Sequence, residues 1–181
     1  PAGYYGDQSS SRTILEARNW TIKDTGLSDD FLSVWQTSIN GESITIPTVE
    51  GLTYNYTINW GDGSAVQSID SDTSPSHTYS ISGEYTITIS GTFPSINFND
   101  GGDKDKIISI PNLGDVGWTN FQMAFKGSSL GELYGGNTSG VTNMQDMFMD
   151  TQDANPDTSG WNTSNVENMM SMFANAASAD P

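Results

Sequence analysis

Alternation between apolar and polar residues predicts several β-strands between residues 31 and 98. The clearest runs are 54–60 and 85–89, where large apolar side chains occupy every second position. A Gly-Asp-Gly turn at 61–63 follows the first run, and shorter runs flank Asn40-Gly41 and cover 66–69 and 93–98. Because aromatic inner faces need an opposing sheet to cover them, we predict a β-sandwich over residues 31–99.

A second pattern, an internal repeat, occupies residues 100–181. The block 141–148 (VTNMQDMF) recurs 25 residues later as 166–173 (VENMMSMF), and a weaker copy begins at Trp118. Apolar residues at i, i+3, i+6 and i+7 predict a short helix in each repeat, with Ser164 and Glu167 as a capping box. Residues 107–110 would supply the first strand. The period favours a solenoid of strand-plus-helix units that must stack to bury their apolar faces.

Residues 1–30 form a third region, the N-terminal segment. The run RTILEAR at 12–18 predicts a short helix, and 20–24 predicts a strand that ends at a turn. The sequence therefore divides into 1–30, 31–99 and 100–181. The predicted class is mainly β, a sandwich followed by a short solenoid.

Composition narrows the classes of partner. Six Lys plus Arg against 22 Asp plus Glu give a formal net charge of −16. That charge repels nucleic acid and anionic lipid, so neither is an expected partner. The chain contains no cysteine, which excludes disulfides and thiolate metal sites. Abundant Gly, Ser, Thr, Asn and Asp with little Lys is typical of a β-rich extracellular protein.

One acidic turn is a candidate metal site. Asp100, Asp103 and Asp105 lie in NDGGDKDK (99–106), and their carboxylates are ligands that Ca²⁺ prefers. The spacing departs from that of an EF-hand and the distal Glu is missing. Lys104 and Lys106 support the alternative of an ordinary turn that is neutralised by lysine. No other cofactor is expected.

No residue pattern indicates catalysis, so we expect the protein not to be an enzyme. His77 is the only histidine and cannot build a triad or a histidine-rich metal site alone. Asp62 sits in the Gly-Asp-Gly turn, where an aspartate satisfies backbone donors. Both are interpreted as structural.

Three stretches resemble segments of two known families. Trp60-Gly-Asp-Gly, His77-Thr-Tyr and Gly83-Glu-Tyr together resemble the PKD type of immunoglobulin-like domain. The block W-x-T-S-x-V-x-x-M-x-x-M-F at 161–173 resembles the BspA-type leucine-rich repeat, and residues 9–26 resemble the closing piece of such an array. The resemblance implies a bacterial, extracellular or cell-surface protein.

Three functions remain open at this point. The first is a structural or adhesion module that contacts surface proteins or glycans. The second is a self-assembling subunit of a filament or virion decoration, in which the C-terminal repeats of one copy contact the N-terminal segment of another, head to tail. The third is a carbohydrate-binding module with an aromatic platform such as Trp161.

Overall fold

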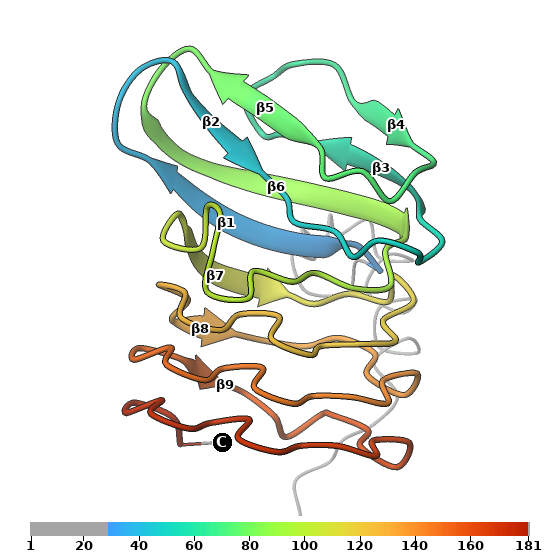
Figure 1. Cartoon of the computed structure of the whole chain (residues 1–181). Coiled ribbons are helices and arrows are strands. Elements are labelled where there is room, and N and C mark those ends of the chain that lie inside the picture. The colour runs from blue at the N-terminus through green and yellow to red at the C-terminus, as the bar shows by residue number, and fades with distance from the viewer. Residues whose placement is uncertain (1–28, 181) are drawn as a thin grey trace, which may run out of the picture.

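The computed structural model describes residues 29–180 and shows a mainly β fold, a sandwich followed by a stack of repeats (Figure 1). The helix and strand predicted within residues 12–24 lie outside the described residues. Residues 29–180 contain no helix, and therefore none that could cross a membrane. The strands are β1 (Phe31–Thr37), β2 (Glu42–Thr45), β3 (Asn55–Asn59), β4 (Gln67–Ile69), β5 (Ser76–Tyr79), β6 (Gly83–Thr92), β7 (Ile107–Asn112), β8 (Glu132–Leu133) and β9 (Asn155–Pro156).

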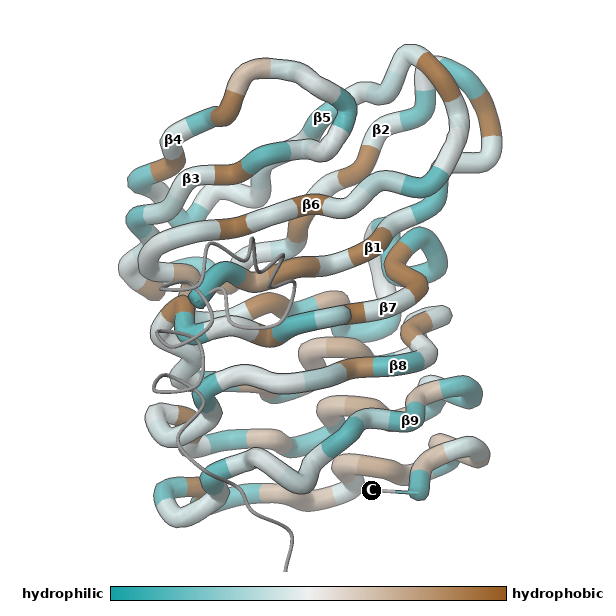
Figure 2. The backbone as a smooth tube through the Cα atoms, turned by 180° about the vertical axis from the view of Figure 1, so that it is seen from behind, coloured by the Kyte–Doolittle hydropathy of each residue, from teal (hydrophilic) through white to brown (hydrophobic). Residues whose placement is uncertain are grey.

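A single seven-stranded sheet runs through both parts of the chain. Its order is β4-β3-β6-β1-β7-β8-β9, while β2 and β5 form a separate two-stranded sheet. Strand β1 pairs antiparallel with β6 on one side and with β7 on the other. From β7 onward the strands are parallel, one from each repeat. Figure 2 shows β6, β1, β7, β8 and β9 following one another down the molecule.

The sandwich core confirms the predicted alternation. Trp60, Tyr79, Ile87 and Ile89 are fully buried together, and Tyr85 is half-buried against the ring of Tyr79 at 3.9 Å between centroids. The polar atoms of Tyr79 and Trp60 have partners: the Tyr79 hydroxyl donates to the Trp60 carbonyl (2.8 Å), and the Trp60 indole donates to Gln67 (3.1 Å).

The Gly-Asp-Gly turn requires glycine at its first position. Gly61 has φ of +80°, a left-handed conformation that other residues adopt at a cost. A Cβ there would lie 2.4 Å from the Thr86 carbonyl oxygen on β6. The close approach lets the turn pack on the neighbouring strand, which explains the glycine physically.

Two of the predicted strand runs differ in detail. The turn at Asn40-Gly41 joins β1 to β2, but these strands belong to different sheets rather than to one hairpin. Residues 93–98 are not a strand. Phe93, Ile96 and Phe98 are nevertheless buried, because the segment packs on the first repeat and forms hydrogen bonds to it, such as Phe98 N to Ala124 O (3.1 Å).

The predicted repeat helices are wrong. Each repeat instead carries a turn block, at 120–127, 143–150 and 168–175, built from overlapping turns in which a residue's N–H donates to the carbonyl three positions earlier. Asp146 and Asp150 have positive φ (54° and 62°), which interrupts any helix. The Ser164–Glu167 capping box is absent as well, since the Ser164 N–H is bonded by Asn162 Oδ1 (3.0 Å).

The left-handed residues turn alternate N–H groups toward the next repeat. Phe121, Met123, Phe125 and Gly127 donate to the carbonyls of Asn143, Gln145, Met147 and Met149, at 2.8 to 2.9 Å. The second turn block bonds the third in the same way. The apolar i, i+3, i+6, i+7 positions then point into the stack, so they are buried without a helix.

An aromatic column fills the interior from the sandwich to the last repeat. Its members stack or tilt against each other in the order Trp35, Phe98, Phe125, Phe148 and Phe173, with centroids 5.4 to 6.5 Å apart. The core is one connected cluster across residues 31–99 and 100–180. The sandwich and the repeats therefore share both a sheet and a core.

A substitution at Trp118 tests the shared core, because this side chain contacts residues of both the sandwich and the first repeat. It is buried against Phe31 of β1, Phe93 and Phe121, with centroids 4.9 to 5.6 Å away, and its indole donates to the Leu113 carbonyl (2.9 Å). We expect Trp118→Ala to cost about 3–5 kcal/mol through the cavity that it leaves. Urea unfolding followed by circular dichroism should stay a single transition that shifts as a whole.

Ile39→Ala is the matched control, because Ile39 is 68% exposed and should change stability by less than about 0.5 kcal/mol. Two separate transitions, with Trp118→Ala moving only one of them, would contradict the shared core.

Candidate functional site

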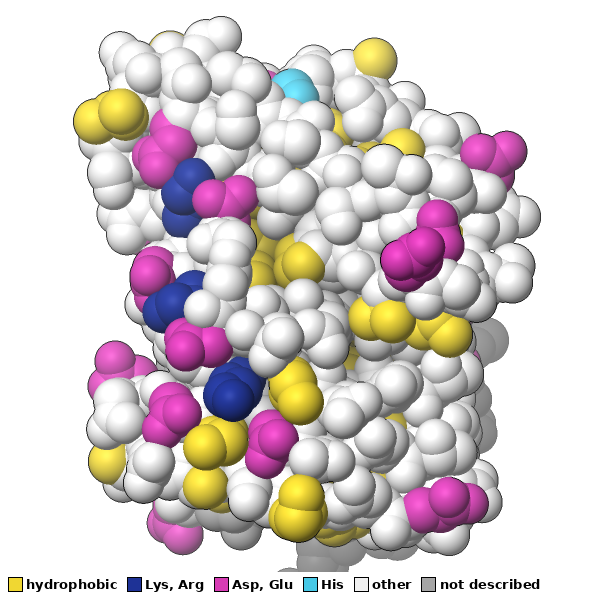
Figure 3. All heavy atoms as spheres, in the orientation of Figure 1, with side chains coloured by type: hydrophobic (Ala, Val, Ile, Leu, Met, Phe, Trp, Pro, Cys, Tyr) yellow, Lys and Arg dark blue, Asp and Glu magenta, His cyan; other side chains and the backbone are white. Residues whose placement is uncertain are grey.

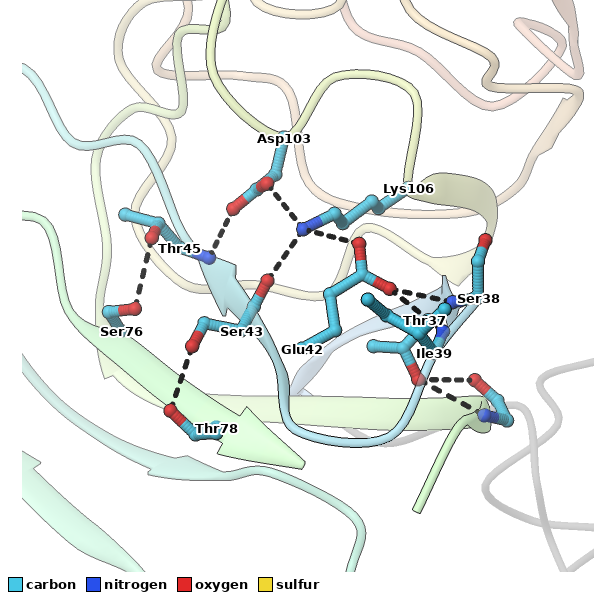
Figure 4. Close-up of polar contacts among 11 residues, drawn as sticks. Thr37, Ser38, Ile39, Glu42, Ser43, Thr45, Ser76, Thr78, Asp103 and Lys106 are labelled. Atoms are coloured by element: carbon cyan, nitrogen blue, oxygen red, sulfur yellow. Dashed lines mark hydrogen bonds and ion pairs between the residues drawn. The ribbon is translucent and has the colours of Figure 1, made fainter. Parts of the chain in front are cut away.

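The acidic turn at 99–106 lies where the sandwich meets the first repeat. Within this turn, Lys106 Nζ contacts Asp103 (2.7 Å), Glu42 of β2 (3.1 Å) and the Ser43 carbonyl (2.6 Å) (Figure 4). The other Asp103 oxygen accepts the Thr45 N–H (2.8 Å). Lys106 therefore ties the two-stranded sheet to the junction.

Glu42 completes this arrangement on the sandwich side. Its second carboxylate oxygen accepts the Ser38 N–H (2.7 Å), and this bond together with Lys106 lowers the pKa of Glu42. Burial works against the charged form of Lys106, but Asp103 and Glu42 outweigh that effect and raise the pKa of Lys106. Both shifts favour the charged forms of Glu42 and Lys106 at neutral pH.

The other two predicted calcium ligands face a different lysine. Lys104 Nζ lies 2.8 Å from Asp105, 3.7 Å from Asp100 and 2.7 Å from the Gly127 carbonyl of the first repeat. Figure 3 shows basic side chains along one edge of this face, each beside acidic ones. The three aspartates are thus divided between two lysines.

This geometry favours the neutralised turn over a metal site. Within residues 29–180, no three His, Asp or Glu side chains gather in a cluster that could hold a metal ion. The ammonium groups stand where a cation between Asp100, Asp103 and Asp105 would bind. Calcium binding there stays a prediction, which a calcium titration of the melting temperature would test.

His77 and Asp62 form a pair on the sandwich surface. His77 Nε2 lies 2.8 Å from Asp62 Oδ2, and the imidazole stacks on Trp60 with centroids 5.1 Å apart. The other Asp62 oxygen accepts the Ser64 N–H (3.0 Å). The pair closes the Gly-Asp-Gly turn over the core tryptophan, which agrees with the structural interpretation of both residues.

A hollow in the face of the third turn block is the best candidate for a binding site. The third turn block has the same apolar positions as the second. Met144 of the second block is fully buried, however, whereas its equivalent in the third block, Met169, is 44% exposed. Phe173 is likewise only half-buried, unlike Phe148. The hollow has a volume of about 360 Å³ and is lined by Met144, Thr158, Trp161, Thr163, Met169, Met172 and Phe173.

Trp161 adds an unused hydrogen-bond donor to this hollow. Its indole nitrogen is buried and has no acceptor within the described part of the chain, whereas the indole of Trp118 is paired. A ligand for this surface therefore needs apolar side chains and an acceptor. The sequence pointed to Trp161 as an exposed platform, but the half-buried indole forms a wall of the hollow instead.

Sequence reasoning missed the role of Glu42 and the open face of the third turn block, that is, the exposed side of residues 168–175 with the hollow beside Trp161. Lys106 had a visible signal, since it lies three residues after Asp103 and directly before β7. Glu42 had none, because its contact with Lys106 depends on how the two-stranded sheet packs. The open face follows from stacking, which the helix interpretation had obscured.

Comparison with known proteins finds one family. Residues 119–180 match the model described as "Mycoplasma protein of unknown function, DUF285", and this range contains all three turn blocks. No curated protein and no solved structure matches the chain. Residues 119–180 of the repeat region thus form a DUF285 domain.

Removing the junction lysine should loosen the junction. We expect Lys106→Met to lower stability by roughly 1 kcal/mol, since partly exposed ion pairs contribute modestly even in networks. Part of this loss should persist in 1 M salt, because the bond to the Ser43 carbonyl is lost too. Urea unfolding at low and high salt measures both effects.

Lys126→Met is the matched control, since no ion pair of Lys126 occurs within residues 29–180. Equal losses for the two variants would show that the Lys106 network does not hold the junction.

The Asp62–His77 pair predicts how stability falls in acid. Contacts with Ser64, whose N–H donates to Asp62 Oδ1, and with His77 at Oδ2 lower the pKa of Asp62. A carboxylate with a depressed pKa stabilises the fold above its unfolded value of about 4, and that contribution is lost as the pH falls below it. Asp62→Asn should therefore lose less stability between about pH 4 and pH 2 than the parent chain.

The measurement is the free energy of unfolding in urea at each pH, with Asp70→Asn as a control on an exposed carboxylate. Parallel pH curves for the parent and Asp62→Asn would overturn the assignment.

Proposed function

We propose that this chain is a non-enzymatic extracellular or cell-surface module that acts as a spacer and an adhesive contact. The observation that carries this proposal is the continuous sheet and aromatic column from sandwich to last repeat. Such an interior makes the module stiff. The hollow beside Trp161 is lined mostly by apolar side chains, unlike the enclosed pockets with converging polar groups that enzymes use.

The side chains that usually carry chemistry have structural partners here. Asp103 and Glu42 neutralise Lys106, and Asp62 holds the turn beside His77. The asparagines that recur in the repeats close local turns: Asn120, Asn143 and Asn168 each accept the N–H two residues ahead at 2.8 to 2.9 Å. The polar residues thus support a stable solvated surface.

Composition supports the extracellular location. A chain without cysteine does not depend on disulfide formation for folding, and its net charge of −16 disfavours aggregation in a crowded surface layer. The matched family's description names no activity. The proposal therefore rests on physical features, together with the resemblance to PKD-type and BspA-type segments of bacterial surface proteins.

Bead adhesion tests the proposal. Beads coated with the folded chain should bind saturably to at least one of a panel of immobilised extracellular-matrix proteins and glycans. Heat-unfolded chain on matched beads should not, because the recognised surface depends on the fold. No binding above the unfolded control would contradict the adhesive role, and retention on glycans alone would favour the carbohydrate-binding alternative.

A further inference from the structure

We propose that the chain's own basic segment, residues 12–23, covers the open face of the third turn block as one more layer of the stack. The open face is the exposed side of residues 168–175 with the hollow beside Trp161. This inference concerns how the chain completes its fold, so it holds or fails independently of the adhesive role.

The backbone of the open face has N–H groups that lack an acceptor within residues 29–180. In the second turn block, the amides of Met144, Asp146, Phe148 and Asp150 each donate to the third block at 2.8 to 2.9 Å. The equivalent amides of Met169, Ser171, Phe173 and Asn175 have no acceptor within residues 29–180. Four donors at every second residue suit a segment that forms another such turn block and offers carbonyls at the same spacing. Such a turn block would replace the short helix that the sequence predicts over residues 12–18.

The side chains of the face require a partly apolar partner. Met169 and Phe173 would be buried by one further layer, as Met144 and Phe148 are by the third block. The indole of Trp161 would gain an acceptor. The basic segment carries the apolar residues for this contact, namely Ile14, Leu15, Trp20 and Ile22.

Charge complementarity favours this occupant. Beyond Lys126 the chain has no basic residue, but it has the acidic residues Glu132, Asp146, Asp150, Asp153, Asp157, Glu167 and Asp180. The basic segment holds Arg12, Arg18 and Lys23, half of the six basic residues of the whole chain. Oppositely charged surfaces attract, whereas the acidic sandwich of a second copy would be repelled.

The linker between Asp29 and the basic segment is also long enough for that segment to reach the open face. Asp29 is held at the corner of the first repeat, where its carbonyl accepts the Asp115 N–H (2.7 Å). Corners at Gly114, Asn137 and Asn162 stack through hydrogen bonds, so the layer beyond the last corner lies about 14 Å from Gly114 at the usual strand spacing. Residues 24–28 span up to about 17 Å when extended, which suffices.

The basic segment of the same chain should bind the open face more readily than the basic segment of a second copy. A tethered segment has an effective concentration near the millimolar range, whereas a second copy must be present at that concentration to compete. Covering the face would also remove an apolar edge that otherwise invites end-to-end association.

Amide exchange in the whole 181-residue chain tests the contact. In the parent, the amides of Met169, Ser171, Phe173 and Asn175 should be protected. In the triple variant Arg12→Glu/Arg18→Glu/Lys23→Glu they should exchange about tenfold faster, equivalent to roughly 1.4 kcal/mol. Lys126→Glu is the control for a charge reversal outside the segment, and it should leave these amides unchanged. Equal exchange in parent and triple variant would overturn the proposal.

Disulfide trapping tells the chain's own segment from that of a second copy. The protein has no cysteine, so Thr21→Cys and Met169→Cys introduce the only thiols. The double variant should form an intrachain disulfide as a monomer, and a mixture of the single variants should give no dimer.

Thr21→Cys paired with Met170→Cys is the control, since Met170 neighbours Met169 but does not line the hollow. Disulfide dimers from the mixed single variants would assign the face to a second copy and overturn the proposal. The absence of any Met169 disulfide, with the parent amides unprotected, would do the same.

Discussion

The repeat region depends on hydrogen bonds that run along its axis, from every second N–H of one turn block to carbonyls of the next. These bonds exist because left-handed residues such as Asp146 and Asp150 rotate alternate amides out of the local turn. A helix would direct all of its amides along its own axis and leave nothing for the neighbouring repeat. The stack is therefore held by backbone geometry as much as by apolar burial.

The same principle joins the repeats to the sandwich. Strand β1 accepts β7 on the edge that β6 leaves free, so the sandwich is the first layer against which the repeats stack. Trp118 and the Lys106 network reinforce that edge from inside and outside respectively. The protein consequently has a beginning for its stack but, within residues 29–180, no matching closure at the other end.

Much of the fold could be predicted from the sequence, and the failures have definite causes. Alternation located β3 and β6 because one face of each is buried in the core. The repeat period was correct, but apolar spacing of three is shared by helices and by successive turns. Asp146, Asp150 and Asn175 held the distinguishing signal, because Asp and Asn tolerate positive φ. At the site, the aspartates were evident, whereas the contact between Glu42 and Lys106 joins residues far apart in sequence.

The aromatic column has a consequence for how such a protein changes length. Each repeat contacts the next one through the same amide spacing and the same phenylalanine contact by which it contacts the previous one. Duplication or loss of one 25-residue unit would therefore alter the height by about 4.8 Å while leaving every remaining interface intact. The number of repeats therefore sets the length of the molecule, so recombination between repeats can change that length while the fold stays the same.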